Sequence, residues 1–269
     1  TTVETLMPDG KSVQAATSHY LGTSFAEAFD ITYADENEEE KTAHTTSWGL
    51  SWRAMGALFM THSDDQGLVL PPALAPEQVV IVPIWQEDNK EEVVGYAEDV
   101  AGELDAAGVR VHLDDRENRN PGFKYNEWEL KGVPVRIEVG PNEVEDEEVT
   151  FVHRPDGESE VEDFEGVGET AHDHLDTVHA KLYASAEETL EGEIREAESR
   201  EEILGTIGQH GGYVKCGWCG DEDCEDPIKD AIAAEIVMVP LDRDEEPIHD
   251  DCAICGEQAE ETAYFAKSY

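Results

Sequence analysis

The sequence predicts a chain that combines α/β and α+β folds, and three observations lead to this prediction. Residues 1–76 carry extended stretches separated by turns, with one short helix. From residue 77 onward, apolar strands alternate with amphipathic helices, which is typical of α/β layers with parallel neighbouring strands. A length of 269 residues suits two or three domains. We therefore expect domains over 1–76, 77–177 and 178–269.

The first of these segments has the pattern of strands and turns. Residues 11–17, 30–33 and 45–52 have the character of strands. The stretch 35–40 reads as an acidic hairpin loop. The apolar run that starts at Arg53 predicts one short helix.

The middle segment alternates strands with helices. Its clearest strand is the apolar run 79–84, which we expect to be buried. A hairpin that begins with the strand at 147–153 is expected at the edge of the sheet. The expected elements are strands over 79–84, 109–113, 133–139 and 147–153, a helix over 89–107, and a loop that enters a helix over 120–130.

The last segment opens with a long amphipathic helix over 170–200. Its apolar stripe is expected to consist of Leu175, Val178, Leu182 and Tyr183. Smaller elements follow it. They are a helix that ends near His210, strands over 212–215, 236–241 and 262–266, and a helix over 227–234.

The chain is extremely acidic. It has 64 Asp and Glu residues against 18 Lys and Arg residues, a formal charge of -46. Disordered chains share such compositions, but here apolar runs such as 79–84 lie between the acidic residues. A dense carboxylate surface stays solvated in molar salt, where the Debye length falls to about 3 Å and self-repulsion is screened. The composition therefore favours a halophilic protein.

Several features bear on the compartment of the protein. No apolar stretch reaches the roughly 18 residues that a membrane span needs, and no signal peptide opens the sequence. The five cysteines are clustered, which favours metal binding in a reducing cytoplasm over disulfides. Thr1 opens what reads as mid-domain sequence, so we expect the chain to be a fragment.

The stretch 46–53 combines features of a ligand site. Gly49 would let a ligand approach the strand backbone closely. Arg53, at the start of the predicted helix, offers a flat cation that can stack on a base or bind a phosphate. By itself, the same pattern also fits a surface arginine that follows a core strand.

Cations are concentrated in one stretch of the middle segment. Arg116, Arg119, Lys124 and Lys131 lie within 16 residues, an enrichment typical of an RNA contact. The same charges also fit a solvated helix face. The overall acidity argues against loose nucleic-acid binding, so affinity would depend on specific contacts.

Cysteine pairs mark the last segment. The pattern Cys216-x2-Cys219-x4-Cys224 is followed by Cys252-x2-Cys255. Four thiolates on tight turns can form the tetrahedral shell that structural zinc prefers. Spacing alone selects the two Cys-x2-Cys pairs and leaves Cys224 out.

Four longer motifs resemble one known family. Residues 8–25 contain PDG and QAATSHYLG, and residues 46–72 contain TSWGLSWR and GLVLPP. Residues 121–134 read PGFKYNEWELKGVP, and residues 264–269 read YFAKSY. In this order, and over essentially the whole chain, the motifs resemble prolyl-tRNA synthetases of the archaeal and eukaryotic type.

The resemblance implies a fold and an activity. Residues 1–76 would be the C-terminal part of a class II synthetase antiparallel catalytic sheet, with motif 3. An α/β anticodon-binding domain and a small α/β zinc-binding domain would follow. The family activates L-proline with ATP and Mg and transfers it to proline tRNA. Structural zinc, a homodimer of the full-length protein and a cytoplasmic location are further implications.

The resemblance also assigns roles to particular residues. Arg53 takes the catalytic position, where it would stack on adenine and hold the triphosphate; class II activation needs such electrostatic positioning and no nucleophilic side chain. Trp52 departs from the small residue that is usual before this arginine. The implied contacts are ATP with Gln14, Thr17, Ser51 and Arg53; proline with His19, Trp48 and Gly49; the anticodon with Arg116, Lys124 and Glu129; and zinc with Cys219, Cys224, Cys252 and Cys255.

The anticodon and zinc assignments have a chemical basis. Proline anticodons carry two successive guanines, whose Watson–Crick edge offers donors to a carboxylate and acceptors to Arg or Lys. For zinc, the resemblance selects Cys224 and leaves Cys216 as the spare thiol.

Two other functions are open on the sequence alone. One is a stand-alone tRNA- or anticodon-binding module without ligase activity, and the other is a zinc-stabilised interaction domain. Gln14, Thr17, His19 and Arg53 all fit the family pattern, which favours an origin in the enzyme. Motifs 1 and 2 have no counterpart in these 269 residues, so we expect this chain alone not to activate proline.

Overall fold

The chain forms two compact units in the computed structural model, which describes residues 1–241 and 246–269. One unit joins Thr1–Met60 to Thr189–Tyr269, and the other is Thr61–Glu188. Strands and helices are mixed in both units, in agreement with the fold class that the sequence predicts. Within the described residues, no helix is both long enough and apolar enough to cross a membrane.

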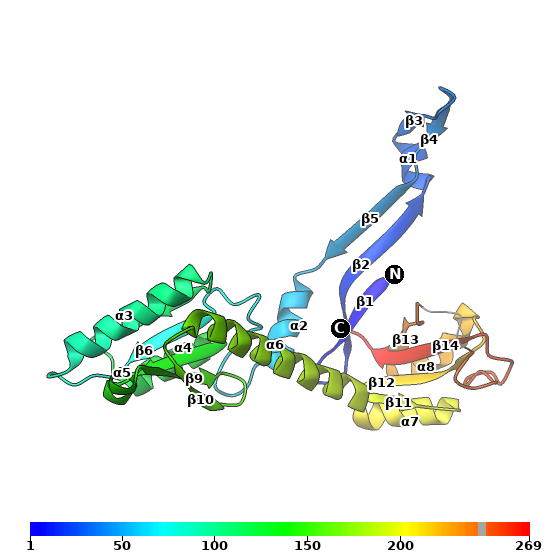
Figure 1. Ribbon diagram of the computed structural model, residues 1–269. Coiled ribbons are helices and arrows are strands. Elements are labelled where there is room, and N and C mark those ends of the chain that lie inside the picture. The colour runs from blue at the N-terminus through cyan, green and yellow to red at the C-terminus, as the bar shows by residue number, and fades with distance from the viewer. Residues whose placement is uncertain (242–245) are drawn as a thin grey trace. The chain divides into compact units, whose positions relative to one another are not determined.

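An antiparallel ribbon dominates residues 1–60 (Figure 1). Strand β2 pairs with β1 on one side and with β5 on the other. The sequence predicted one helix here and the structure has two, because α1 is too short for its periodicity to be recognised. The elements are β1 (Thr2–Leu6), β2 (Ser12–Gly22), α1 (Ser24–Ala28), β3 (Thr32–Ala34), β4 (Glu40–Thr42), β5 (Thr45–Leu50) and α2 (Arg53–His62).

A four-stranded sheet of order β11-β12-β14-β13 forms the other part of this unit. Ile203, Ile207, Ile228 and Phe265 are buried in its core. The parallel edge strand β11 was not predicted, since three residues are too few to show an alternating pattern. The elements are β11 (Ile194–Glu196), α7 (Arg200–His210), β12 (Tyr213–Trp218), a 3-10 turn η1 (Glu222–Glu225), α8 (Asp226–Ile232), β13 (Ala234–Met238) and β14 (Glu261–Lys267).

The turn between β1 and β2 packs against the start of β12 within the same unit. The backbone N–H of Gly212 donates to the Gly10 carbonyl at 2.8 Å. Gly10 has φ of +77°, and a Cβ there would lie 2.9 Å from the Gly212 nitrogen. Both the left-handed conformation and the close backbone approach therefore require glycine at this turn. Beside it, the buried hydroxyls of Ser12 and Tyr213 are 3.1 Å apart.

The second unit has a five-stranded sheet of order β10-β9-β8-β6-β7. Strand β6 runs parallel to both β7 and β8, as the alternation of strands and helices predicted, and the antiparallel hairpin of β9 and β10 forms one edge. The strands are β6 (Val79–Pro83), β7 (Val111–Leu113), β8 (Val135–Val139), β9 (Glu148–His153) and β10 (Ser159–Asp163), and the helices are α3 (Lys90–Ala106), α4 (Pro121–Lys131), α5 (Pro141–Asp146) and α6 (Val167–Gly192).

Helices cover both faces of this sheet. Val79 and Ile81 point to one face, where they join the core formed with α3 and α6. Val80 and Val82 point to the other face and pack with Trp128 of α4. Strand β6 is fully buried on both faces, as its uninterrupted apolar run predicted.

Helix α6 differs from the prediction in two respects. It ends at Gly192 instead of about residue 200. Leu175, Val178 and Leu182 are buried as predicted, but the Tyr183 side chain is 63% exposed. Tyr183 follows Leu182 directly, and the step of about 100° per residue turns it away from the core.

Two buried histidines connect the edge hairpin to α6. His153 Nε2 lies 2.8 Å from His174 Nδ1, and Lys181 Nζ lies 3.2 Å from His153 Nδ1. Since an ammonium group only donates, His153 accepts at Nδ1 and donates from Nε2 to His174. Burial, then the charge of Lys181 and the second ring, lowers the pKa of His153. Protonation of His153 at Nδ1 would therefore remove its hydrogen bond from Lys181 and place two cations side by side.

We predict that this pair destabilises the second unit in acid. The pKa of His153 is lowered by folding, so its contribution to stability is present above the unfolded-state pKa of about 6.5 and is lost as pH falls below it. Hydrogen exchange of β9 and α6 amides, corrected for intrinsic rates, should show local unfolding free energy decreasing from pH 7.5 to 5.5, and His153→Gln should flatten that slope. His179→Gln, an exposed histidine on α6, is the control, and equal flattening there would contradict the prediction.

Candidate functional site

The β2–β5 pair brings three of the predicted ligand residues onto one face. Thr17 lies opposite Gly49, and His19 lies opposite Ser47. Because side chains alternate along a strand, Thr17, His19 and Gly49 share a face and Trp48 lies on the opposite one. A Cβ at Gly49 would meet nothing within 4 Å, so the backbone is open to a ligand there. Trp48 is 79% exposed.

Ser51 and Arg53 form a local structure at the start of α2. The Ser51 Oγ accepts from the Arg53 backbone N at 3.0 Å and from its Nε at 3.2 Å. Arg53 is exposed, and no carboxylate of the described residues lies within salt-bridge distance of it. Gln14 is half-buried on β2, where a shift in register opposite Val3 and Glu4 interrupts the regular alternation. Arg53 is therefore a preoriented cation that is free to bind an anion.

A second cluster is centred on the buried carboxylate of Asp114, which follows β7. Asp114 accepts from Arg116 Nε at 2.8 Å, from Arg116 Nη2 at 2.7 Å and from Trp128 Nε1 at 2.8 Å. Burial alone would raise the pKa of Asp114, but these hydrogen bonds and the nearby Lys124 ammonium hold it well below its usual range. Asp114 thereby connects the end of β7 to α4.

Lys124 and Arg116 occupy different environments in this cluster. The Lys124 side chain is 1% exposed, and its ammonium donates to the Asp114 carbonyl at 2.7 Å and lies over the Trp85 ring. The Arg116 side chain is 38% exposed and also binds Glu127, while its Nη1 has no partner in the described part of the chain. Arg116 can therefore contact a ligand directly, whereas Lys124, predicted as a base-contacting residue, does not reach the surface.

Glu129, the third predicted anticodon residue, is partly exposed and is held by Arg136, whose Nη1 donates to it at 3.1 Å. Nearby, Arg154 donates to both carboxylate oxygens of Asp64 at 2.7 and 2.8 Å, and these bonds lower the pKa of Asp64 to about 2. The four side chains line a pocket of about 250 Å³. Within this group each arginine is bound to a carboxylate, Arg136 to Glu129 and Arg154 to Asp64.

The sequence reasoning missed Asp114 and Trp128. One signal was present: an aspartate directly after a buried strand, followed two residues later by an arginine, commonly forms a local ion pair. The inward direction of the Asp114 side chain depends on the packing of α4 and could not be derived from spacing.

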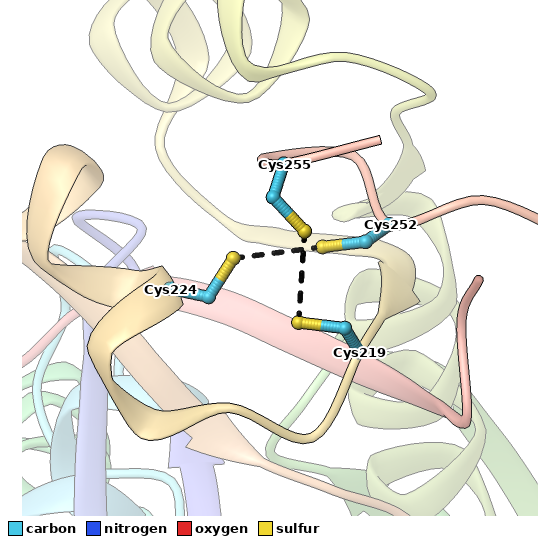
Figure 2. A group of neighbouring side chains, drawn as sticks. All are labelled: Cys219, Cys224, Cys252 and Cys255. Carbon is cyan, nitrogen blue, oxygen red and sulfur yellow. Dashed lines mark hydrogen bonds between the residues drawn. The ribbon is translucent and has the colours of Figure 1, made fainter. Parts of the chain in front are cut away.

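Four cysteines from two segments meet at one point. Figure 2 shows the sulfur atoms of Cys219, Cys224, Cys252 and Cys255 facing one another, and all four lie within 4.8 Å of each other. The Sγ atoms of Cys224 and Cys252 are 3.7 Å apart, as are those of Cys219 and Cys255. A tetrahedral site with Zn–S bonds of about 2.3 Å would have sulfur–sulfur edges of about 3.8 Å. The geometry therefore fits a four-thiolate metal site.

The backbone around the cluster favours the thiolate form of one ligand. Burial would raise the pKa of Cys252, but N–H groups of Cys255 and Ile254 stabilise the thiolate and lower its pKa to about 7. Cys216 is separate: it is fully buried in the apolar core, and burial raises its pKa to about 12. The quartet that spacing alone selects is not formed.

Comparison with known proteins shows what this chain is similar to. Residues 78–172 match the family model "Anticodon binding domain", and residues 200–269 match "Prolyl-tRNA synthetase, C-terminal". The whole chain is 85% identical to a proline–tRNA ligase of Haloarcula marismortui and 71% identical to one of Halorubrum lacusprofundi. The chain is a homologue of part of the proline–tRNA ligases. It covers 56% of each of these two relatives, about half of their length.

A solved structure extends the comparison to the fold. The prolyl-tRNA synthetase of Cryptosporidium parvum, complexed with halofuginone and AMPPNP, matches with a TM-score of 0.90 at 35% identity. The match covers all of this chain and 57% of that one. The resemblance to prolyl-tRNA synthetases and the fold class inferred from the sequence are thereby confirmed.

We predict that Asp114→Asn strongly destabilises the proline–tRNA ligase homologue. The substitution removes the carboxylate that offsets a buried ammonium, and breaking a buried charge pair costs about 3–5 kcal/mol. Urea unfolding in molar KCl measures the loss. Asp115→Asn, at the exposed neighbouring position, should stay within about 0.5 kcal/mol. Similar losses in both variants would contradict the role of Asp114.

Proposed function

We propose that this chain is part of a proline–tRNA ligase that activates L-proline with ATP and transfers it to proline tRNA. The observation that carries the proposal is 85% identity over the whole chain to a protein of that name. The free guanidinium of Arg53 beside an open ribbon face supports it chemically. We infer functional segments over 1–76, 77–177 and 178–269, a homodimer when the enzyme is complete, and a cytoplasmic location.

Arg53 is the proposed catalytic residue. Its planar cation can stack on adenine and stabilise charge on a triphosphate during in-line displacement, which depends on positioning and electrostatics. Ser51 holds the Arg53 side chain in place through its hydroxyl. Gln14 and Thr17 complete the proposed ATP contacts from β2, and Mg accompanies the ATP.

The proline contacts fall on the same ribbon. His19 and the open backbone at Gly49 lie on the face that also carries Thr17, so ATP and proline would meet there. Trp48 lies on the opposite face and is 79% exposed, so we propose only an indirect contribution to proline binding for it. This arrangement brings the carboxylate of the amino acid close to the bound nucleotide, as adenylate formation requires.

The proposed anticodon contacts are Arg116 of the Asp114 cluster and Glu129 of the pocket that Trp128 also lines. Arg116 offers Nη1 as a donor to a base acceptor, and Glu129 offers carboxylate oxygens to a base donor. Lys124 acts as a positioning residue: its ammonium fixes the Asp114 backbone, and Asp114 holds Arg116. The match of residues 78–172 to an anticodon-binding family supports this assignment.

Zinc is the proposed metal of the four-cysteine cluster. A complete thiolate shell leaves no open position, so the ion would be structural and would connect the turn around Cys219 to the loop around Cys252. Thiolate binding contributes directly to the folding free energy of such small domains.

The ligase proposal is tested by proline-dependent ATP–pyrophosphate exchange. The 269-residue chain alone should show none, because one cation provides little of the preorganised field that adenylation needs. Fusion to the part of the Haloarcula marismortui relative that the chain does not match should restore exchange. In that fusion, Arg53→Ala should lower the rate about 100- to 1,000-fold, whereas Arg195→Ala should not. The proposal would be refuted if the chain alone catalysed exchange, or if Arg53→Ala left the exchange rate of the fusion unchanged. A fusion that binds tRNA but catalyses no exchange would favour a stand-alone binding module.

The zinc proposal predicts about one equivalent of metal per chain after dialysis against a weak chelator. Cys219→Ser and Cys224→Ser should release it, since each removes one of four ligands. Cys216→Ser should retain it because that thiol lies in the apolar core. Metal content below a tenth of an equivalent, or loss in the Cys216 variant alone, would argue against this ligand set.

A further inference from the structure

An exposed cation–aromatic pair stands beside the proposed anticodon contact. The Arg119 guanidinium carbon lies 4.4 Å from the centroid of the Phe123 ring. Phe123 is 44% exposed, and Arg119 is exposed as well. The pair therefore presents a flat guanidinium and an aromatic ring together at the surface, one turn apart at the start of α4.

Arg119 also differs electrostatically from most other cations of the chain. With 64 acidic residues available, none of the described carboxylates lies within salt-bridge distance of Arg119. Of the acidic residues that precede it, Glu117 binds Lys90 and Asp114 binds Arg116, and the exposed Asp115 does not pair with it. The positive charge of Arg119 thus remains available to an anionic ligand.

The segment that carries the pair is fixed at both ends. At one end, Asp114 holds Arg116 through two hydrogen bonds. At the other end, the Asn120 side chain accepts from the Phe123 backbone N–H at 2.8 Å and caps α4, with Pro121 at the first helical position. The Phe123 ring is therefore presented from a preorganised backbone.

We propose that Arg119 and Phe123 form a stacking platform for one unpaired RNA base next to the base contacted by Arg116. This inference rests on the proposed function, since it concerns the same RNA. Every base has a π-face that can stack on an aromatic ring or a guanidinium plane, and bases in single-stranded loops are free to do so. An acidic peptide would use the charge of Arg119 but not the ring, so RNA explains both members of the pair.

Stacking also suits a chain of this charge. In molar salt, phosphate contacts contribute little to affinity, because counterion release is weak and screening is strong. Base stacking is less dependent on ionic strength. A platform of this kind would supply affinity where the rest of the surface repels RNA.

The test is fluorescence titration of the full chain in molar KCl with three proline tRNA transcripts. Each carries 2-aminopurine at a different position of the anticodon loop. One position should be quenched on binding, and Phe123→Leu should relieve that quenching and weaken affinity roughly 10- to 100-fold, the effect typical of losing a base–aromatic stack. Arg119→Lys keeps the positive charge but removes the planar guanidinium, and it should weaken binding less than Phe123→Leu does. Arg195→Lys, an arginine paired with Glu193, is the matched control and should change nothing.

The experiment distinguishes failure of the anticodon proposal from failure of the stacking platform. If the unchanged chain binds proline tRNA no better than a tRNA with an altered anticodon loop, the anticodon proposal and the platform both fail. In the other case, the unchanged chain prefers proline tRNA, while Phe123→Leu and Arg119→Lys show the same affinity and the same 2-aminopurine quenching as the unchanged chain. That result would overturn the platform alone. Phe123→Leu replaces a partly exposed side chain, and circular dichroism verifies that the variant is folded.

Discussion

The excess of 64 acidic over 18 basic side chains is the constraint on which the other features depend. Most cations of the described residues form an ion pair with a carboxylate. Arg154 binds Asp64 bidentately, and Lys181 lies between Asp156 and Glu158. A cation that stays free of carboxylates on such a surface is a more informative feature than it would be on an ordinary one. Arg53, Arg110 and Arg119 are exposed arginines with this property among the described residues, but Arg110 donates to the backbone carbonyls of Pro72 and Ala75, whereas the other two have no such acceptors.

Asp114 shows how the same constraint organises a site. One buried carboxylate binds an exposed arginine and a tryptophan N–H and lies near a buried lysine. Its negative charge is stabilised inside the protein, and its pKa is held low, because those donors outweigh the effect of burial. In return, Arg116 is held with its Nη1 free, three residues before Arg119 of the proposed platform. The core of the unit and its proposed RNA contact therefore share one residue.

Much of the fold could be predicted from the sequence, and the exceptions have physical reasons. The buried strand β6 and helices α3 and α4 follow from apolar runs and periodicity. Strand β11 and helix α5 were not predicted, since three and six residues carry too little pattern. Lys124 was expected to contact RNA because its cation suits the acceptors of a guanine, and only the packing of α4 on the sheet shows that its ammonium is enclosed.

The cysteines illustrate the same limit for the candidate metal site. Spacing favours Cys216, but its side chain points into the core of the β12 sheet, whereas Cys224 reaches the cluster from the 3-10 turn that follows. A Cys-x2-Cys spacing fixes two thiols only if both lie on one tight turn, and Cys216 lies within a strand. The resemblance to a family selected the quartet that the structure brings together, and local spacing did not.

Carboxylate repulsion sets the salt concentration at which this protein is folded. The most direct test of this claim is the melting temperature by circular dichroism as KCl falls from about 3 M to 0.1 M, over which the Debye length grows from under 3 Å to about 10 Å. The account predicts a steep fall in melting temperature, with little protection by sucrose in place of salt, because an uncharged solute does not screen charges. A melting temperature independent of KCl, or one restored equally by sucrose, would contradict it.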